Sequence, residues 1–582
     1  MLNSETCHFW VAGRKADSTP VLEMRKHGAF RFCVKTSAYV IPAAGVASLI
    51  YRWSDTPSHP STRSLDFPFN FLNGVFRSSR AFFTIASCVV DYKRSLYGVS
   101  ASSDEYQRVL SEIHQRSATK ILKLCDDNRG FYVKAGQFVA AMRQVPKEYS
   151  STLSVLQDQA VPCNFDAIRD VIIQSLGKDL SEIFFSFDEQ PVAAASIAQV
   201  HHAVLKDLQE VAVKVQYPGL QYLMKFDLAT MGFLSKSVAW LYPDYRFHWM
   251  VSEFSKNIAF ELDFIQEAKN SERAANNFKN NSMVEIPCIY WDYTSSQVLT
   301  MQFCTGQKVD DLEFLKQTGI NPLEVAKVLV EAFAEMIFVH GFLHGDPHPG
   351  NILVSPRGPN GFSLVILDHG IYKSLAEEFR QNYCKLWEAL ILMDSQAILQ
   401  LGEAFGVGKF SKYFPVIFTG RTIDSKSTLG SQMPREEREH LKEELKSLKM
   451  EDISSFMESL PPQFLAIMRT DGLLRSLVSK LGAPQRIRLL AYAKYSIRGA
   501  SKDASFVSGP AVFLVYKFKT TLKYIYLRLL LEIIELAAYM GNIRHTLAVR
   551  LRRFISSLGG LVHSPLFTTP LMVAPQKKCR GC

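Results

Sequence analysis

The sequence lacks the features that would assign it to several protein classes at once. No internal repeat is evident, which argues against a solenoid or a propeller. Its ten cysteines show no pairing pattern, so the disulfide framework of a small secreted domain is not indicated. Cys88, Cys288 and Cys304 stand in apolar strings, and we expect them to be reduced core residues of an intracellular protein.

The N-terminal part also lacks an apolar run of the length that crosses a membrane. The uncharged segment Thr36–Tyr51 is slightly short for a span, and a proline and a glycine interrupt it. A second apolar string, Ala81–Val90, is shorter still. Residues 1–35 carry six Lys/Arg against three Asp/Glu, which is compatible with organelle targeting. Two interpretations stay open: a processed leader followed by a core helix, or entry of one string into a membrane.

Composition favours a large folded protein with an anionic partner. The 582 residues leave room for two to four domains, and 47% hydrophobic against 21% charged residues supports a large packed core. The net charge of 66 − 56 = +10 suits nucleotide, lipid headgroups or nucleic acid. The middle of the chain lacks basic clusters interleaved with aromatic residues, so we do not expect nucleic acid as the partner.

The apolar pattern changes along the chain from helical to strand-like and back. Helical spacing begins at about residue 104, and residues 190–218 alternate as strands do. A helix is expected from about 247 to 279, and a buried strand in "QVLTMQFCTG". Residues 320–500 are mostly helical, apart from a hairpin in which "SPRGPNG" joins "NILV" to "FSLVILD".

Lys214 stands in the strand segment "EVAVKVQYPG", on the face opposite to its three valines. A lysine there is usually only solvated, but a phosphate-binding lysine needs a carboxylate to hold it. The segment "AFELDFIQEAKN" offers Asp263, Glu267 and Asn270 on one polar stripe of the expected helix. Taken alone, that stripe is better explained as a solvated helix face.

Three further polar residues have the spacing of a magnesium–nucleotide site. Asp346 and Asn351 show the D-x-x-x-x-N spacing of a kinase catalytic loop, and Asp368 opens "DHG". In that template the first aspartate orients the acceptor hydroxyl, while the asparagine and the later aspartate hold magnesium. Magnesium prefers oxygen ligands, which Asn and Asp supply.

A competing interpretation is a zinc site made of His340, His344 and His348, which are spaced four apart. On an unbroken helix these side chains would share one face. The glycines and prolines between them argue against such a helix.

Glycine is missing where a kinase covers the phosphates with a glycine-rich loop. Upstream of Lys214 the chain reads "AAASIAQVH", from Ala193 to His201. Glycine lets backbone amides close onto phosphates, whereas alanine adds a methyl group and keeps helical propensity. We therefore expect a stiffer cover, with a different nucleotide pose or preference.

Together and in this order, the motifs resemble those of the UbiB, or AarF-domain-containing, atypical kinases, and are most similar to the AarF-domain-containing kinase 1 type. The resemblance covers roughly residues 100–400. Its marks are "KAGQ" (Lys134–Gln137), "LQDQAVP" (Leu156–Pro162), "AAASIAQVH" (Ala193–His201), "VAVKVQYPG" (Val211–Gly219), "ELDFIQEAKN" (Glu261–Asn270), "HGDPHPGN" (His344–Asn351) and "LDHG" (Leu367–Gly370). The first, third and sixth are highly specific to the family.

The resemblance implies an α+β, protein-kinase-like fold of two lobes. A helical N-terminal extension carries the K-x-G-Q motif and folds over the place where a protein substrate would sit. The expected domains are a targeting or membrane-proximal segment (1–100), the helical extension (101–175), an N-lobe (176–305), a C-lobe (306–505) and a basic, apolar tail (506–582).

The resemblance also implies roles for single residues. The implied catalytic residues are Asp346, Lys214 and Glu267. The implied magnesium ligands are Asn351 and Asp368. The implied nucleotide-binding residues are Ala193, Ala194, Ala195, Ser196, Lys214, Met301 and Phe303. The implied gating residues are Lys134, Gln137, Glu261 and Asp263, and we expect the lysine and glutamine to pair with the two carboxylates and hold the extension shut.

By the same resemblance the protein is expected to bind ATP or ADP with Mg²⁺ and to act as an atypical kinase or ATPase of unknown acceptor. It would support ubiquinone or other isoprenoid-lipid metabolism in a mitochondrion, or alternatively a plastid, with lipid or protein partners at a membrane. The alternative from another class is a nucleotide-gated scaffold without turnover, which organises membrane-associated partners.

The C-terminal tail leaves its interpretation open. Lysines interrupt the apolar strings of Phe513–Phe554, which suits a membrane surface, a partner or a plain pair of core helices. The final "CRGC" is only weak support for a metal site or a prenylation box.

Two departures from the family pattern bear on the site. His369 stands in "DHG" where the common form has phenylalanine, although Asp368 remains. Gln302 stands where the family usually has glutamate. Because hinge contacts to adenine are mostly made by the main chain, we expect nucleotide binding to survive both changes.

Overall fold

The computed structural model describes most of the chain between residues 66 and 529, together with residues 532, 533 and 536. The gaps are 101–102, 141–144, 158–161, 242–253, 256–257, 259–260, 358–360, 424, 426–432, 434, 448–455, 457–458, 501–517 and 519–520. The apolar string Thr36–Tyr51, the basic segment before it, the final "CRGC" and most of the C-terminal tail lie outside the described residues.

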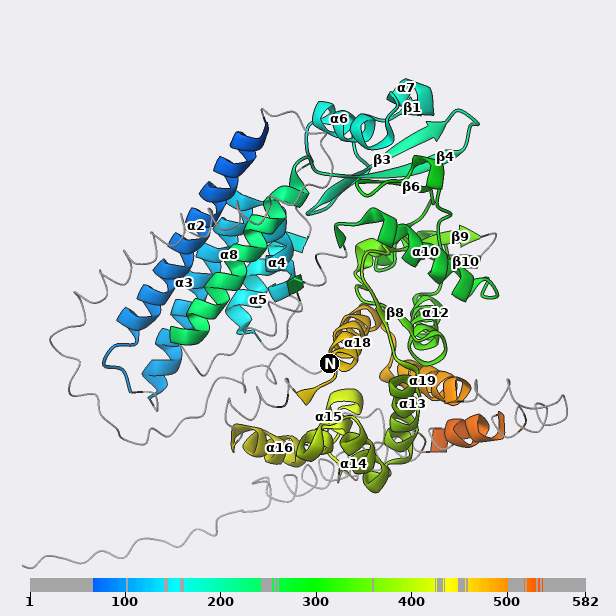
Figure 1. Cartoon of the computed structure of the whole chain (residues 1–582). Coiled ribbons are helices and arrows are strands. Elements are labelled where there is room, and N and C mark those ends of the chain that lie inside the picture. Colours follow the sequence, from blue (N-terminus) through cyan, green and yellow to red (C-terminus); the bar gives the residue numbers. More distant parts are fainter. Residues whose placement is uncertain are drawn as a thin grey trace, which may run out of the picture.

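An antiparallel sheet forms the upper lobe in Figure 1. Its strands run in the order β1-β3-β4-β6, and β2 pairs with β3. Their bounds are β1 (Phe184–Phe187), β2 (Ala193–Ala194), β3 (Ala198–Leu205), β4 (Glu210–Gln216) and β6 (Val298–Gln302). Val211, Val213 and Val215 pack into one core with α6 (Phe165–Leu176), so the alternation expected for β4 is confirmed. The opposite face of β4 carries Lys214 into the space between the lobes.

The lower lobe is mainly helical. Its small sheet runs β5-β10-β9-β7, and the expected hairpin is present as β9 against β10. The strand bounds are β5 (Val284–Glu285), β7 (Gln307–Lys308), β9 (Ile352–Arg357) and β10 (Gly361–Ile366), while β8 (Phe342–His344) pairs with β11 (Tyr372–Ser374). The main helices are α10 (Phe264–Phe278), α11 (Leu312–Gln317), α12 (Pro322–Glu335), α13 (Glu377–Leu392), α14 (Ser395–Ala404), α15 (Phe414–Thr419), α16 (Arg435–Ser447), α18 (Pro462–Lys480) and α19 (Gln485–Ala500).

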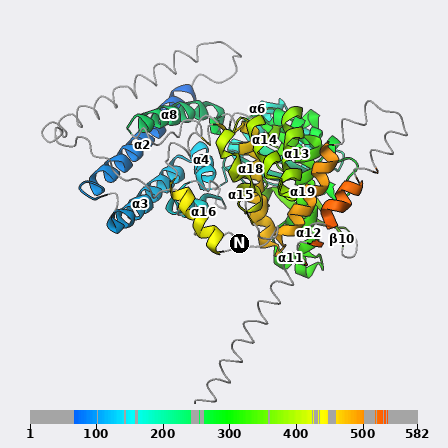
Figure 2. The same cartoon turned by 90° about the horizontal axis from the view of Figure 1, so that it is seen from below.

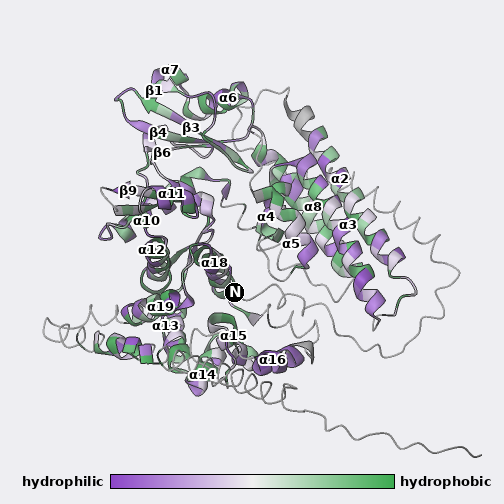
Figure 3. Cartoon of the chain, turned by 180° about the vertical axis from the view of Figure 1, so that it is seen from behind, coloured by the Kyte–Doolittle hydropathy of each residue, from purple (hydrophilic) through white to green (hydrophobic). Residues whose placement is uncertain are grey.

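Aromatic side chains fill the core of the lower lobe. Phe338, Trp387 and Tyr492 are buried and pack edge to face around the crossing of α13 and α19. Gly499 allows the closest approach there, because an added Cβ would lie 2.1 Å from the carbonyl oxygen of Phe338. By contrast, α16 on the outside of this lobe is strongly hydrophilic (Figure 3).

A separate layer of helices lies beside both lobes (Figures 1 and 2). It consists of α2 (Asp66–Ser95), α3 (Asp104–Asn128), α4 (Phe131–Ala140), α5 (Lys147–Leu153) and α8 (Leu220–Leu241). The guanidinium Nε of Arg77 on α2 lies 3.1 Å from the carboxylate of Asp227 on α8, and both side chains are buried. The layer therefore combines a helix from the N-terminal region with one that follows strand β4. The fold is α+β, with two lobes and a helical extension.

Three expectations need correction or refinement. The helix expected over 247–279 is broken, because Asp263 is extended and caps the N-terminus of α10 by accepting from the N–H of Ile265. Cys288 is exposed rather than part of the core, while Cys88 is buried. The string Ala81–Val90 lies within α2. Among the helices that the structure describes, none combines the length and hydrophobicity that a bilayer crossing requires.

Candidate functional site

The ammonium group of Lys214 lies between two carboxylates. Its Nζ is 2.6 Å from Oε1 of Glu267 and 3.3 Å from Oδ2 of Asp368. It also lies over the ring of Phe264, 5.1 Å from the centroid. Burial alone would lower the pKa of Lys214, but Asp368 and Glu267 outweigh it and raise that pKa above its usual range. Lys214 therefore stays charged in the site.

Helix α10 supplies the carboxylate and also holds the segment that contains Asp368. Glu267 stands in its first turn and is 2% exposed, so the interpretation of a solvated helix face is wrong for this residue. One turn later, Asn270 is also buried and donates to the carbonyl oxygen of His369 at 3.0 Å. Burial raises the pKa of Glu267 to about 7, against the lowering effect of the Lys214 charge.

A buried histidine joins the two aspartates through their main chains. His344 accepts from the N–H of Asp346 at Nδ1 (3.1 Å), and its Nε2 donates to the carbonyl oxygen of Asp368 (2.6 Å). Burial lowers the pKa of His344, which keeps it in the neutral tautomer that this pattern requires. The sequence indicated His344 only as a candidate metal ligand, so this role became visible in the structure.

Asn351 is tied to both aspartates. Its side-chain Nδ2 donates to the main-chain carbonyl oxygen of Asp346 at 3.1 Å. Its main-chain carbonyl oxygen accepts from the N–H of Leu367 at 2.9 Å. The second bond fixes it beside Asp368, the next residue along the chain. Because the amide nitrogen is committed, the side-chain oxygen is the atom that Asn351 can offer to a cation.

The extension contributes a second lysine. Nζ of Lys134 on α4 lies 2.9 Å from Oε2 of Glu261. Burial would lower the pKa of Lys134, but Glu261, Asp346 and Asp368 together raise it. Both lysines, Glu261, Glu267, Asp346 and Asp368 line one small pocket, together with Ala195 and Ser196.

The other two expected gating contacts are not made. Gln137 donates to the carbonyl oxygen of Leu156 at 2.8 Å instead of reaching a carboxylate. Asp263 is exposed and serves as the cap of α10. Lys134 and Gln137 therefore act on different partners, because α4 turns one side chain to the pocket and the other to its own layer.

Gly136 explains why α4 lies so close to that layer. A Cβ at this position would lie 2.4 Å from Cδ1 of Leu156 and 3.1 Å from the sulfur of Cys125. The absence of a side chain brings Gln137 within reach of Leu156. In the K-x-G-Q motif, the glycine and glutamine thus seat the helix from which Lys134 reaches the pocket.

The alanine-rich cover is held by bonds within the protein. The N–H of Ala195 donates to the carbonyl oxygen of Ala198 at 2.8 Å, and the hydroxyl of Tyr217 donates to the carbonyl oxygen of Ala195 at 2.9 Å. Ala193 and Ala194 pair with strand β3 and do not line the pocket, whereas Ala195 and Ser196 do. The N–H of Ala195 is therefore not available to a phosphate oxygen.

The expected adenine contacts are placed differently. Met301 pairs with Ala212 in the sheet, and the N–H of Phe303 donates to the carbonyl oxygen of Glu210 at 3.2 Å. Neither Met301 nor Phe303 lines the pocket around Lys214. The sheet therefore already uses the main-chain N–H of Phe303.

The pocket suits a divalent cation by its charge and ligand types. Four carboxylates against two ammonium groups leave a formal charge of −2, which one Mg²⁺ balances. The side-chain oxygens of Asn351 and Asp368 are the ligand type that magnesium prefers. Of these two residues, Asp368 lines the pocket and Asn351 does not. His340 ends a helical turn, His344 stands in β8 and His348 lies in the loop that follows, and in the described part of the chain no three His, Cys, Asp or Glu side chains cluster as metal ligands. The zinc interpretation is not supported.

Arg469 on α18 is a site residue that sequence analysis missed. Its Nη2 lies 3.8 Å from Oδ1 of Asp346, and its guanidinium lies over the ring of Phe138 on α4, 5.4 Å from the centroid. It thus touches the loop that carries Asp346 and the helix that carries Lys134. Its distance of more than one hundred residues from either motif explains why local sequence patterns did not reveal it.

Comparison with known proteins identifies the family. Residues 155–402 match the family model described as "ABC1 atypical kinase-like domain". Over 415 residues the chain is 40% identical to AarF domain-containing protein kinase 1 of Xenopus tropicalis. The alignment covers 70% of this chain and 79% of that protein. The chain belongs to the ABC1, or AarF-domain, family of atypical kinases.

Other family members are similar over comparable lengths. AarF domain-containing protein kinase 1 of Mus musculus is 38% identical over 441 residues, covering 75% of this chain and 82% of its own. A Dictyostelium discoideum protein named probable serine/threonine-protein kinase abkD is 35% identical over 520 residues. That alignment covers 89% of this chain and 72% of the Dictyostelium protein. Among solved structures, the complex of Rv3197 with erythromycin from Mycobacterium tuberculosis has a TM-score of 0.45 at 22% identity and covers 68% of this chain and 99% of that chain.

Removing the carboxylate that holds Lys214 is expected to destabilise this ABC1-family chain. Breaking one side of a buried ion pair costs about 3–5 kcal/mol, and Asp368 remains as a partner, so Glu267→Ala should fall near the lower end. Urea unfolding of the nucleotide-free proteins measures the loss. The control is Glu324→Ala, an exposed partner of Lys327, which should change stability by less than about 1 kcal/mol. Equal midpoints for Glu267→Ala and wild type would contradict the role given to the pair.

His369→Phe is expected to weaken the acid sensitivity of the fold. Burial lowers the pKa of His369 to about 3, and its nitrogens bond to the Tyr372 hydroxyl and the Ile366 carbonyl oxygen. Because the folded pKa is depressed, this contribution to stability is complete above about pH 6.5 and declines as pH falls towards 3.

One such group contributes a slope of up to about 1.4 kcal/mol per pH unit. Unfolding free energies at pH 7, 6 and 5 should therefore fall less steeply for His369→Phe than for wild type. His344, whose pKa burial also lowers, is unchanged in this variant, so part of the pH dependence of stability remains. The exposed His440 provides the control, and His440→Gln should keep the wild-type slope. An unchanged slope in His369→Phe would show that His369 is not held neutral.

Proposed function

We propose that this ABC1-family protein binds a magnesium nucleotide in the Lys214 pocket and transfers or hydrolyses its γ-phosphate. The observation that supports this most is the convergence of Lys214, Glu267, Asp346 and Asp368 from four separate segments onto one pocket. A merely structural ion pair needs two partners. Here a charged lysine faces the side chains that the kinase template uses for phosphate positioning, acceptor orientation and magnesium binding.

Each residue has a distinct task in this proposal. Lys214, held by Glu267, binds phosphate oxygens, and Asn351 with Asp368 would hold the magnesium ion. The ion, when bound, neutralises charge on the phosphates. Asp346 accepts the proton of the attacking hydroxyl or water, since its side chain is a quarter exposed at the pocket. His344 fixes the main chains of both aspartates and is a positioning residue.

The acceptor is proposed to be small or lipid-like rather than a folded protein. Helix α4 closes one side of the pocket through Lys134 and Glu261, so a protein hydroxyl would have to displace the helical layer. The family resemblance suggests isoprenoid-quinone or other lipid metabolism, in a mitochondrial membrane setting with lipid-metabolism partners. A plastid setting is the alternative location.

A second candidate is a nucleotide-gated scaffold without turnover. It is favoured by one observation: Lys134 enters the pocket beside both aspartates and pairs with Glu261. In that case nucleotide binding would displace Lys134 and move the helical layer. Phosphate release by the purified protein distinguishes the two candidates.

Wild type is expected to release phosphate from ATP, whereas Asp346→Asn should bind nucleotide without turnover. Asp368→Asn should lose Mg²⁺-dependent binding, because a charged oxygen ligand is removed. Nucleotide titrations with and without Mg²⁺, combined with a phosphate-release assay, test both statements. Asp310→Asn, which neutralises the half-buried partner of the exposed Lys480, is the control.

The two measurements test the enzyme proposal and the magnesium assignment separately. Binding without release in wild type would support the scaffold and reject the enzyme. An unchanged Mg²⁺ dependence in Asp368→Asn would reject the magnesium assignment itself.

Lys134→Ala is expected to loosen the closure and raise labelling of the protein by radiolabelled ATP several-fold. The physical reason is that α4 loses its ion pair to Glu261 and no longer holds the pocket shut. Labelling should disappear in the double variant with Asp346→Asn. Lys327→Ala, an exposed lysine of the C-lobe, is the control. Labelling equal to wild type, or labelling that persists without Asp346, would show that Lys134 does not gate the site.

A further inference from the structure

The last helical segment that the structure describes lies against the lower lobe. Residues 521–529 are helical, as are residues 518, 532, 533 and 536, and we call this segment the tail helix. Figures 1 and 2 draw it in orange-red beside α19. Leu527 is fully buried in the core of the lobe, and Tyr524 packs against the same core. The tail helix therefore belongs to the folded lobe.

Ion pairs to two helices of the lobe hold the tail helix in place. Nζ of Lys523 lies 2.5 Å from Oε1 of Glu388 on α13. One to three turns later, Oε1 of Glu532 lies 3.5 Å from Nη2 of Arg486 on α19. Leu527 lies between these two contacts along the chain. Three points of attachment thus fix which side of the tail helix faces the lobe.

The other side of the tail helix exposes large apolar side chains. Each of them is between 44% and 66% exposed: Phe518, Leu522, Ile525, Tyr526, Leu529, Ile533 and Leu536. On a helix of 3.6 residues per turn these positions fall within about 100° of one another, and Leu527 lies on the opposite side. We call these seven residues the apolar stripe.

The apolar stripe is larger than the apolar patches of an ordinary soluble monomer. Its side chains expose on the order of 700 Å², against roughly 300–600 Å² for the largest patch on a typical monomer. A patch of that size marks an interaction site. The described residues also argue against one interpretation of Phe513–Phe554, a plain pair of core helices, because among their large apolar side chains only Leu527 is fully buried.

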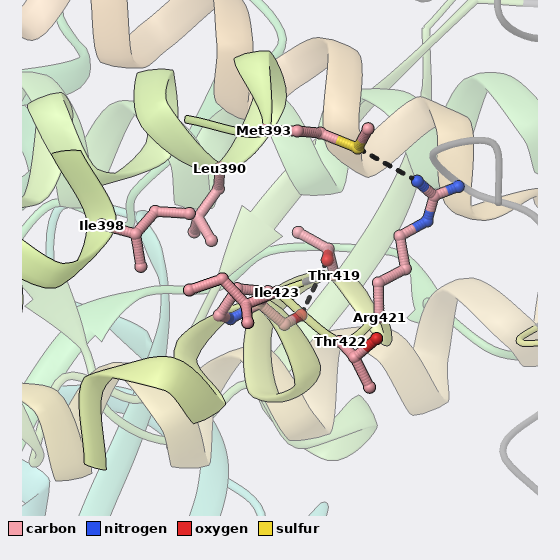
Figure 4. A pocket seen from close by; sticks show the side chains of 8 residues that line it. Leu390, Met393, Ile398, Thr419, Arg421, Thr422 and Ile423 are labelled. Atoms are coloured by element: carbon pink, nitrogen blue, oxygen red, sulfur yellow. Dashed lines mark hydrogen bonds between the residues drawn. The ribbon is translucent and has the colours of Figure 1, made fainter. Parts of the chain in front are cut away.

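The small pocket of the lower lobe offers no alternative place for an apolar partner. It lies between α13, α14 and α15, with Leu390, Ile398 and Ile423 in its wall (Figure 4). Its volume of about 20 Å³ has room for about one water molecule. A partner of the apolar stripe therefore binds at the surface of this lobe.

Charge distinguishes the partners that could cover the apolar stripe. The tail sequence Phe513–Phe554 contains eight Lys/Arg and two Asp/Glu, a formal charge of 8 − 2 = +6. A second copy of the chain would bring the same positive charge and be repelled, whereas anionic lipid headgroups attract it.

The shape and composition of the apolar stripe also favour a lipid surface. A width of about 100° exceeds the narrow seam along which two helices form a coiled coil. Tyr526 stands at one edge of the stripe. An aromatic ring with a polar hydroxyl suits that position, because it matches the boundary between headgroups and acyl chains.

We propose that the tail helix docks this protein onto the surface of an anionic lipid bilayer, with the apolar stripe towards the acyl chains. The helix lies parallel to the membrane, and its apolar face enters the headgroup boundary by about 5–10 Å. The ion pairs to Glu388 and Arg486 hold the lower lobe above it. The proposal gives a surface to the membrane setting of the proposed function, but neither nucleotide nor turnover enters it.

Flotation of the full chain with lipid vesicles tests the proposal. Wild type should float with phosphatidylcholine vesicles that contain about 30% phosphatidylserine and much less with phosphatidylcholine alone, because the basic tail requires anionic headgroups. Added salt should weaken this binding without abolishing it, because salt screens the charges and not the apolar contact. With anionic vesicles, Tyr526→Trp should show a blue shift of tryptophan emission that wild type lacks.

Substitutions within the apolar stripe isolate the surface. Ile525→Glu combined with Leu529→Glu should weaken binding to anionic vesicles at least about tenfold, because two charges enter the middle of the apolar face. Both side chains are about half exposed, so this double variant should melt as wild type. Ile525→Ser combined with Leu529→Ser should bind with intermediate strength. The matched control is Leu323→Glu, at an exposed leucine of α12, which should bind as wild type.

A phosphate-release assay without vesicles separates this proposal from the proposed function. The variants of the apolar stripe should release phosphate as wild type does, because they lie outside the nucleotide pocket. Asp346→Asn should float as wild type does. A wild type that floats but releases no phosphate would reject the enzyme and keep the membrane surface.

Three outcomes would overturn the proposal. One is the failure of wild type to float with anionic vesicles, and another is equal flotation of the double glutamate variant. The third is a dimer of wild type in solution, seen by light scattering, that the double glutamate variant does not form, because this result would assign the apolar stripe to a second copy. Equal flotation with neutral and anionic vesicles would reject the role given to the basic tail.

Discussion

The charge on Lys214 is the constraint on which the arrangement of this molecule depends. A buried ammonium group must be neutralised, and its two partners come from different parts of the chain: Glu267 from α10 and Asp368 from the turn after β10. One interaction therefore fixes the β4 sheet, the helix beneath it and the second lobe relative to one another. The distance between the lobes is limited by the same interaction, because the Lys214 side chain spans the space between them.

The bonds around this ion pair form a continuous set. Asn270 holds the carbonyl group of His369, and His344 links the main chains of Asp346 and Asp368. Asn351 adds a further link to Asp346. On the two aspartates these bonds use only main-chain groups. The aspartate side chains line the pocket. The site is thus held by its main chain. The carboxylate of Asp368 accepts from the N–H of Gly370 and pairs with Lys214, whereas that of Asp346 has only a longer contact, 3.8 Å, to Arg469.

The helical extension acts on the same pocket from the opposite side. Gly136 permits close packing, Gln137 anchors to Leu156, and Lys134 is thereby carried to Glu261. Arg469 joins this helix to the loop of Asp346 by contacting both. The order of the motif is explained by these separate tasks: one residue enters the pocket, and the other two seat its helix.

Much of the site follows from the sequence because its residues belong to short, strongly patterned segments. The alternation around Lys214, the spacing from Asp346 to Asn351 and the position of Asp368 after a hairpin are local properties, and the resemblance to a known family adds the K-x-G-Q motif. Only the tertiary structure decided which groups these residues contact. Glu267 became buried rather than solvated because Lys214 and His369 lie against it, and Asp263 became a helix cap because the chain turns there. Arg469 carries no local signature, since its partners Asp346 and Phe138 lie more than one hundred residues away, and such a contact depends on packing between distant segments.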